Sequence, residues 1–141
     1  MTGDEACSVE RILAHLQTEI NRLDRLAAAT LQVGSAEDLQ VLRLLLGSGP
    51  MRVGEIAATR CSSVANISAR LDRLERRGLV VRERPPGDRR AVVAVLSDEG
   101  KDAAEASRCE RLAAIEELEA DFPIERLQAL VDTLADLTPA G

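Results

Sequence analysis

Arginine is concentrated in one stretch of this 141-residue chain, between residues 60 and 90. The stretch holds nine arginines and four acidic residues, a formal net charge of +5, whereas the remainder holds nine basic and twenty acidic residues, a net charge of −11. The planar guanidinium group donates paired hydrogen bonds to phosphate oxygens and to the edge of guanine. One basic surface on an acidic protein therefore indicates a docking site for nucleic acid, with repulsion elsewhere.

Small polar side chains open the same stretch and offer a second kind of chemistry. A serine or asparagine on the exposed side of a helix can donate and accept hydrogen bonds at base edges in the major groove of DNA. Long cations on a loop can enter a narrow minor groove or contact phosphates. The predicted major-groove residues are Ser62, Ser63, Asn66, Arg70 and Arg73. The predicted phosphate and minor-groove residues are Arg84, Arg89 and Arg90.

The helix that would present the major-groove residues is marked by a cap, an apolar face and a glycine. Ser62 or Ser63 is expected to cap it, and it runs to Arg77. Gly78 ends it, because glycine readily adopts the left-handed conformation found after a helix C-terminus. The predicted apolar face consists of Val64, Ile67, Leu71 and Leu74.

A turn and a hairpin flank this polar helix. A short helix over residues 53–59 and a turn at 60–62 precede it, although two short helices joined by a tight turn are alone a weak signal. The valine-rich segments 79–84 and 91–96 follow it, joined by the sequence PPGDRR, and they predict a β-hairpin. A hairpin with cations at its tip, directly after a polar helix, is a much more specific pattern. It indicates a winged helix-turn-helix.

Two helices are predicted before the short helix. The first covers residues 8–29, and Ser8 is expected to cap it. Ser35 is expected to cap the second, which the sequence GSGP at residues 47–50 ends, and residues 51–53 follow as a short edge strand. The apolar face of the first helix consists of Ile12, Leu16, Ile20, Leu23 and Leu26.

Two more helices are predicted after the hairpin. Ser97 and Gly100 open a long helix to about residue 120, and the last helix begins at Pro123 and ends at Pro139. Apolar faces at both ends of the chain are typical of a helical dimer platform. We therefore expect a mainly α fold with a small β-wing (α+β) in a single domain. Its parts are a DNA-binding lobe at about residues 35–98 and dimerisation helices at about 8–30 and 100–138, within residues 1–141.

Three motifs make the chain similar to a known family. They are LDRLERRGLV at residues 71–80, DRR at 88–90 and LSDEG at 96–100. They resemble the pattern of the MarR family of bacterial transcription regulators. In that family a recognition helix ends in L-x-x-L-x-x-x-G-L-[IV], the wing carries D-x-R, and L-[ST]-x-x-G opens the next helix. The order and spacing of the helices also match, so the resemblance covers nearly the whole chain.

The resemblance implies a homodimer whose outer helices intertwine and whose two lobes meet consecutive major grooves of a pseudo-palindromic operator. Arg90 matches the wing arginine that reaches the minor groove, and Asp88 matches the acid that braces the wing arginines. Many members of the family repress their own and neighbouring genes. They release DNA when a small anionic or phenolic ligand binds between the dimer helices and the DNA-binding lobe. Other members sense oxidants through cysteine, and a few sense zinc.

The three cysteines raise the question of a redox function. Cys7 lies near the start of the first helix, where redox-sensing relatives pair a cysteine with tyrosines, but this chain has no tyrosine. Cys61 lies beside Arg60 at the start of the polar helix, and a helix N-terminus and a cation both favour a reactive thiolate. Ordinary free thiols are the alternative for both residues. Cys109 is expected to be a buried packing residue.

Other activities find little support in the residue types. The sequence has one histidine, His15, and dispersed cysteines, whereas a zinc site needs three or four nitrogen or sulfur ligands, so we expect no metal. It has no nucleophile elbow and no P-loop, so we expect neither an enzyme nor a cofactor. Asp72 and Glu75 are expected to pair with Arg73 or Arg76 along their helix.

The cellular location follows from two further patterns. No apolar run in the sequence is long enough to span a bilayer, and the first residues lack the basic and then apolar pattern of a signal peptide. We therefore expect a cytoplasmic protein that does not interact with membranes. Besides a ligand-responsive or redox-responsive repressor, one alternative remains open. The winged helix could be an interaction module for another protein, which predicts no salt-dependent affinity for DNA.

Overall fold

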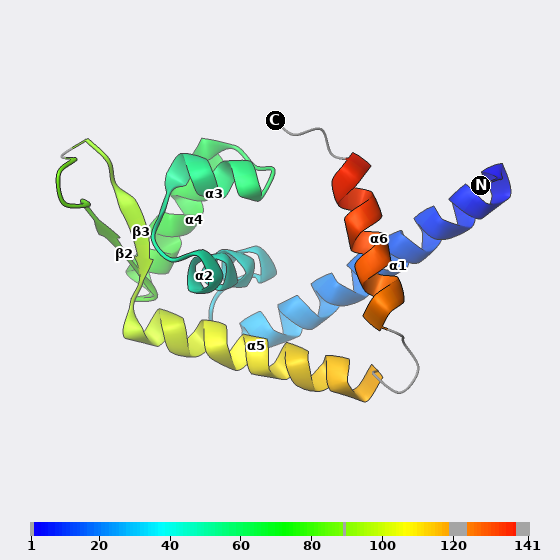
Figure 1. The fold of residues 1–141 in the computed structure, drawn as a ribbon. Coiled ribbons are helices and arrows are strands. Elements are labelled where there is room, and N and C mark those ends of the chain that lie inside the picture. The colour runs from blue at the N-terminus through cyan, green and yellow to red at the C-terminus, as the bar shows by residue number, and fades with distance from the viewer. Residues whose placement is uncertain (1, 89, 119–123, 138–141) are drawn as a thin grey trace. The chain divides into compact units, whose positions relative to one another are not determined.

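The structure, a computed structural model, describes residues 2–88, 90–118 and 124–137. The chain forms two compact units, Met1–Ser107 and Arg108–Gly141. The first unit combines helices with a three-stranded antiparallel sheet (Figure 1). This arrangement confirms the predicted fold class, mainly α with a small β-wing, whereas the single domain and its boundaries stay a prediction.

Helix α1 (Gly3–Thr30) begins earlier than the sequence pattern predicts. Its start is a capping box: the Thr2 hydroxyl oxygen accepts from the Glu5 backbone N–H at 3.3 Å, and the Glu5 carboxylate accepts from the Thr2 N–H at 2.8 Å. The prediction that Ser8 caps this helix is wrong, because Ser8 lies inside it and donates its hydroxyl to the Asp4 carbonyl. A capping box six residues earlier takes precedence over a single serine.

Helix α2 (Ala36–Ser48), strand β1 (Met51–Arg52) and helix α3 (Val53–Thr59) follow. Ser35 caps α2 as predicted, since its hydroxyl oxygen accepts from the backbone N–H of Asp38 at 3.2 Å. Gly49 ends the helix with a φ of 77°, a conformation that favours glycine. The GSGP sequence therefore stops the helix where the residue types predict.

Helix α4 (Val64–Arg76) carries Asn66, Arg70 and Arg73 of the predicted major-groove residues, and Ser62 and Ser63 directly precede it. Of the two serines that could cap it, Ser63 does so, since its hydroxyl oxygen accepts from the Asn66 N–H at 3.1 Å. At the other end Gly78 has a φ of 74°, and the Leu79 N–H donates to the Leu74 carbonyl at 2.9 Å. The glycine stop is therefore confirmed.

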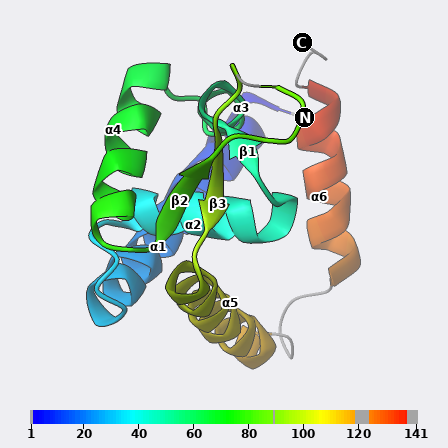
Figure 2. The same ribbon diagram turned by 90° about the vertical axis from the view of Figure 1, so that its left-hand side faces the viewer.

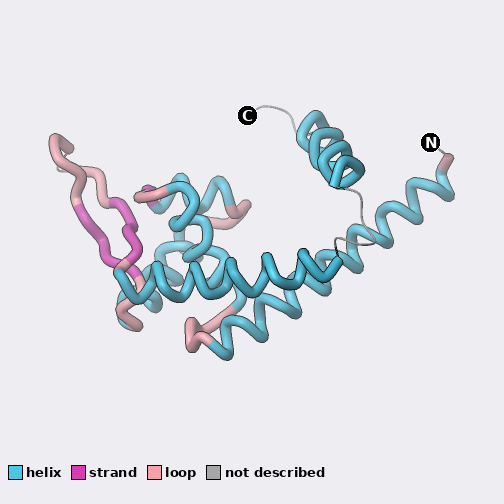
Figure 3. Tube along the Cα trace, turned by 60° about the horizontal axis from the view of Figure 1, so that its bottom comes forward, coloured by secondary structure: helices cyan, strands magenta, loops and turns pink. Residues whose placement is uncertain are grey.

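Strands β2 (Val80–Glu83) and β3 (Val93–Leu96) form the hairpin and are slightly shorter than the predicted segments. The strand order is β1-β3-β2, so β3 is central, with Val80 opposite Leu96 and Met51 opposite Ala94 (Figure 2). The loop that joins β2 to β3 extends beyond the paired strands (Figure 3). The predicted edge strand and hairpin are both confirmed.

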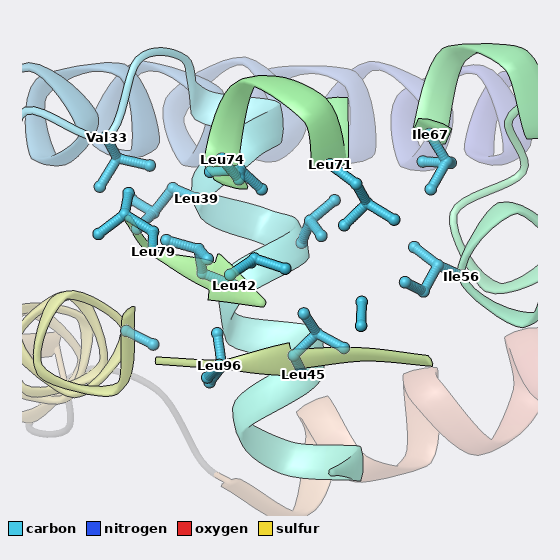
Figure 4. Close-up of a cluster of buried hydrophobic side chains, with 14 of the residues drawn as sticks. Val33, Leu39, Leu42, Leu45, Ile56, Ile67, Leu71, Leu74, Leu79 and Leu96 are labelled. Atoms are coloured by element: carbon cyan, nitrogen blue, oxygen red, sulfur yellow. The ribbon is translucent and has the colours of Figure 1, made fainter. Parts of the chain in front are cut away.

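One cluster of aliphatic side chains holds this part of the chain together (Figure 4). Leu39 and Leu42 of α2 are fully buried beside Ile56 of α3 and side chains of α4 and the sheet. The predicted inner face of α4 is confirmed for Ile67, Leu71 and Leu74, which are at most 1% exposed. Val64 was predicted on the same face but is 57% exposed, because it is the first residue of the helix and lies a turn before the first buried one.

The start of helix α5 (Asp98–Leu118) is bound closely to the end of α4. The Ser97 hydroxyl oxygen accepts from the Gly100 N–H at 3.1 Å, and the same hydroxyl donates to the Gly78 carbonyl at 2.6 Å. The Ser97 N–H donates to the Leu79 carbonyl at 3.1 Å. Serine therefore serves as a helix cap and also as a connection to the end of α4.

Helix α6 (Ile124–Leu137) belongs to the second unit. Pro123 and Pro139, which were predicted to bound it, lie outside the described residues. Within the described residues, none of the helices is sufficiently long and apolar to cross a lipid bilayer.

The apolar face predicted for α1 is largely exposed in the single chain. Near its C-terminus α1 packs on the core through Ala27 and Ala28, which are buried. The side chains along the remaining apolar face are 37–59% exposed, and they are Val9, Ile12, Leu16, Ile20, Leu23 and Leu26. We call these six residues the α1 stripe. So many large exposed aliphatic residues in one row indicate a surface that another apolar surface covers.

Candidate nucleic-acid interface

Helix α4, the predicted major-groove helix, presents short polar side chains to solvent. Ser63 and Asn66 are exposed and Ser62 is half-buried, while the opposite face of the helix is buried in the core. Alanines at positions 65 and 69 are also exposed, so the outer face has little bulk. A helix with a small, polar outer face can approach base edges closely. The structure therefore brings Ser62, Ser63 and Asn66 together at the first turn of one helix.

Arg70 and Arg73 have a partner inside the protein that the sequence analysis did not identify. The Arg70 guanidinium donates to the Asp38 carboxylate at 3.1 Å and to the Ser35 hydroxyl oxygen at 3.3 Å. Arg73 lies 3.8 Å from the same carboxylate and is about half exposed. The Asp38 side chain is 4% exposed, so this anion depends on its cationic partners. Asp38 therefore braces α4 against the start of α2.

A second brace joins α4 to the wing. Arg82 of β2 pairs with Asp72 at 2.9 Å, lies 3.9 Å from Glu75, and donates to the Ser68 carbonyl at 3.1 Å. The expectation that Asp72 and Glu75 pair with Arg73 or Arg76 along their helix is therefore wrong. Helical spacing identifies neighbours on the helix, but it does not detect a cation that β2 places beside the same carboxylates.

The wing carries the remaining predicted contacts. Arg84 and Arg90 are exposed on either side of the hairpin loop, and Arg89 lies outside the described residues. The Asp88 carboxylate accepts from the Arg90 backbone N–H at 3.0 Å and lies 3.5 Å from the guanidinium of Arg52 in β1. Asp88 therefore fixes the loop backbone next to Arg90. The sequence analysis missed Arg52, because nothing in its local pattern links β1 to the wing tip.

The three cysteines are all exposed and unpaired. Cys61 lies in the turn before α4 and has a φ of 50°, which is uncommon for a residue with a side chain. Cys7 lies near the start of α1. The expectation that Cys109 is a buried packing residue is wrong, since it is exposed on α5. His15, which was weighed as a metal ligand, is exposed on α1.

An open groove lies between the end of α1 and the start of α2. Its volume is about 360 Å³, and its lining carries both charges. The lining residues are Asn21, Arg25, Gly34, Ser35, Ala36 and Glu37. Ser35 also accepts a hydrogen bond from Arg70 of α4. The same serine therefore lines the groove and contacts the arginine that pairs with Asp38.

Comparison with known proteins gives the family. The sequence profile of the MarR family matches residues 35–92. HTH-type transcriptional regulator FarR of Neisseria gonorrhoeae is 35% identical over 101 residues, which are 70% of this chain and 67% of that protein. The homoprotocatechuate degradative operon repressor of Escherichia coli is 28% identical over 102 residues, 72% of this chain and 69% of that protein. Three Bacillus subtilis regulators are 37–43% identical over 58–67 residues, and the chain spans about two-fifths of their length.

A solved structure agrees with these relatives. The crystal structure of NadR in complex with 4-hydroxyphenylacetate is 28% identical and superposes with a TM-score of 0.74, covering 94% of each chain. By its fold and by its relatives, this chain belongs to the MarR family of transcriptional regulators.

Proposed function

We propose that this protein is a homodimeric, sequence-specific regulator that binds a pseudo-palindromic duplex DNA and represses its own and neighbouring genes. The observation that supports this most is the division of α4. One face is buried in the core, the other exposes short polar side chains, and an exposed basic wing follows it directly. This arrangement is what a helix in the major groove and a loop at the minor groove require. Such a regulator acts in the cytoplasm.

In this proposal some residues contact DNA, and others hold the DNA-contacting elements in place. Ser62, Ser63 and Asn66 contact base edges in the major groove, and Arg73 adds a cation at the same surface. Arg84, Arg89 and Arg90 contact phosphates and the minor groove. Arg70 was predicted to contact DNA, but its bond to Asp38 makes it a brace in this proposal. Asp88 holds the wing loop.

The homodimer is proposed from the α1 stripe. Six large aliphatic side chains in one row would expose much apolar surface to water in a monomer. A second copy of the same helix supplies a matching apolar row, as a two-fold interface requires. A dimer also provides the two recognition helices that a pseudo-palindrome needs.

A small-molecule effector is part of the proposal. The relative from E. coli is named as the repressor of a degradative operon, and NadR was crystallised with an aromatic acid. The groove beside α1 and α2 has a volume of about 360 Å³, within the range of small-ligand sites of roughly 300–1,000 Å³. A ligand there would contact Ser35 and could disturb the brace on α4.

The first test is binding to the DNA upstream of the protein's own gene. Fluorescence polarisation with labelled duplex and excess nonspecific competitor should show binding that survives the competitor and weakens steeply as salt rises. Arg90→Ala should weaken binding to this duplex by at least about 1 kcal/mol. Arg22→Ala is the matched control, since this arginine is exposed on α1 and lies away from the wing.

Two outcomes would count against the proposal. Unchanged affinity of Arg90→Ala would contradict the wing assignment. If the upstream DNA does not bind, selection from a randomised duplex library decides whether the operator lies elsewhere. A protein that enriches no sequence in that selection and shows no salt-dependent affinity for DNA is an interaction module for another protein.

A further inference from the structure

A buried carboxylate lies at the junction of three helices. Asp24 of α1 is 1% exposed, and burial of an anion is costly unless it is paired and hydrogen-bonded. Arg43 of α2 donates to both of its carboxylate oxygens at 2.9 Å, as a two-pronged fork. The same guanidinium donates to the hydroxyl oxygen of Ser107 in α5 at 2.9 Å. The pair therefore joins α1, α2 and α5.

Gln40 connects this pair to the helix-turn-helix. Its side-chain amide nitrogen donates to the Asp24 carboxylate at 2.9 Å. Its side-chain carbonyl oxygen accepts from the guanidinium of Arg60. Arg60 is the residue that ends α3 and begins the turn to the recognition helix. Gln40 therefore lies between a buried anion on α1 and a cation at the turn.

The amide of Gln40 can take only one orientation here. An ionised carboxylate only accepts hydrogen bonds, so the nitrogen end of the amide must face Asp24. The oxygen end then faces the other way, where only a donor can satisfy it, and the Arg60 guanidinium is such a donor. Reversal of the amide would face an acceptor with an acceptor and a donor with a donor. The orientation set at Asp24 thus determines where Arg60 is held.

The turn that Arg60 begins has a demanding backbone. Cys61 follows with a φ of 50°, and Ser63 then caps α4. Backbone hydrogen bonds hold the turn to α3: the Arg60 N–H donates to the Ile56 carbonyl at 2.9 Å, the Cys61 N–H to the Ala58 carbonyl at 3.3 Å and the Ser62 N–H to the Ala57 carbonyl at 2.9 Å. A fixed Arg60 side chain adds a further restraint on the turn from which Ser62 and Ser63 project.

We propose that Gln40 is a positioning residue: its amide transmits the geometry of the buried Asp24–Arg43 pair to Arg60 and so fixes the turn that places the recognition helix. This inference rests on the proposed DNA-binding function for its consequence, but the positioning itself can be measured without DNA. In a chain that lacks the Gln40 amide, Arg60 is released and the first turn of α4 loses its fixed starting point.

Hydrogen exchange tests the positioning directly. In full-length Gln40→Met, the amide N–H groups of Cys61 and Ser62 should exchange several-fold faster than in the wild type. Gln128→Met is the matched control, since Gln128 also donates its amide to a carboxylate, that of Asp132, on exposed helix α6. Faster exchange at residues 61 and 62 in Gln40→Met alone is the expected result. Unchanged exchange there in a folded Gln40→Met would overturn the proposal.

A double-mutant cycle tests the consequence for DNA. The probe is a duplex selected by the wild-type protein from a randomised library, compared with a scrambled duplex of equal length. Gln40→Met and Arg60→Met should each lower the affinity of the protein for the selected duplex about tenfold. The double variant should bind that duplex no more weakly than either single variant. A merely structural loss would reduce the active fraction equally for both duplexes, whereas loss of positioning lowers the ratio of their affinities.

The hydrogen-exchange and DNA-binding experiments distinguish a failure of the positioning role of Gln40 from a failure of the proposed DNA-binding function. Effects of Gln40→Met and Arg60→Met that multiply on the selected duplex would show that they act independently, which contradicts the proposal. If the wild type selects no duplex, the DNA-binding function is wrong, and the hydrogen-exchange result alone decides whether Gln40 holds the turn. If the double variant does not fold, the single variants and their exchange rates still decide.

Discussion

A Cβ atom at Gly100 would overlap the carbonyl oxygen of Leu79. The two backbones meet where α5 begins and α4 has just ended, beside the bonds that Ser97 makes to Gly78 and Leu79. This close approach is the physical reason for glycine in the LSDEG motif. It places the start of α5 against the end of α4, so the first turn of the long helix is joined directly to the helix that we propose contacts DNA.

Gly100→Ala should destabilise the protein by about 1–3 kcal/mol, because the added methyl group must displace backbone. Urea unfolding at a fixed protein concentration measures this change. Gly47→Ala is the control: Gly47 lies inside α2 and none of the described atoms lies within 4 Å of its missing Cβ. The free energy of unfolding of Gly47→Ala should be about 0.5–1 kcal/mol higher than that of the wild type, because alanine is the better helix former. Equal effects of the two substitutions would contradict the assigned role of Gly100.

The α1 stripe gives a prediction about the oligomer. Ile12 is 59% exposed in the single chain and is the second of the six residues in the row. Burial of such a side chain contributes about 1.5–3 kcal/mol, so Ile12→Gln should raise the dimer dissociation constant roughly ten- to hundredfold. Sedimentation velocity over a range of concentrations measures the constant. Ala14→Gln adds the same side chain on the opposite side of α1 and should change the dissociation constant little. A larger effect of Ala14→Gln than of Ile12→Gln would place the interface elsewhere.

Asn66 should read one base of each half-site. Asparagine pairs with adenine in the major groove through two hydrogen bonds, worth about 1–3 kcal/mol of discrimination. Asn66→Ala should therefore lose the base preference at one position of each half-site while it keeps affinity for DNA in general. Selection from a randomised duplex library shows this directly. Asn21→Ala, on α1, should leave the selected sequence unchanged. If Asn66→Ala also selects the same sequence as the wild type, Asn66 does not contact base edges.

Cys61 offers a stability prediction through its backbone. Its φ of 50° favours a residue without a side chain, so Cys61→Gly should stabilise the protein by up to about 1 kcal/mol. Thermal unfolding at fixed concentration detects the change. Cys109→Gly removes the same side chain from inside helix α5 and should instead destabilise the protein by roughly 0.3 kcal/mol.

The same variant tests the redox hypothesis. Oxidation of an exposed thiol in the turn before α4 adds polar bulk beside Ser62 and Ser63. Under that hypothesis, peroxide lowers the DNA affinity of the wild type and of Cys7→Ser but not of Cys61→Gly. Protection by Cys7→Ser instead would move the sensor to α1, and equal affinity of all three proteins with and without peroxide would leave Cys61 as a simple turn residue.

The local elements could be predicted from the sequence because their signals are local. Ser35, Gly49 and Gly78 begin or end helices through bonds to residues a few positions away, and valine-rich segments on either side of PPGDRR pair as a hairpin. The face of α4 that enters the core was also predictable. The prediction that Val64 is buried is wrong, because periodicity identifies the apolar face of a helix but not how far along the helix other elements cover that face.

The braces that hold α4 could not be predicted, because each joins residues of two different elements. Arg70 and Asp38 are 32 positions apart, and the chain offers many other arginine–carboxylate pairs at comparable separations. Arg82 of β2 likewise pairs with Asp72 of α4, where helical spacing favours Arg76. Residue type predicts that each carboxylate finds a cation. Only the tertiary fold determines which one.

The bond between Arg43 and Ser107 spans 64 positions of the chain, and this has a consequence for biosynthesis. A growing polypeptide cannot complete the Asp24 site until residue 107 has left the ribosome, whereas the hairpin and the helix-turn-helix are by then already synthesised. Until that moment the Arg43 guanidinium lacks its acceptor on α5, although its bonds to Asp24 can already form. The hairpin and the helix-turn-helix can therefore fold first, and their attachment to α5 through Arg43 is completed last.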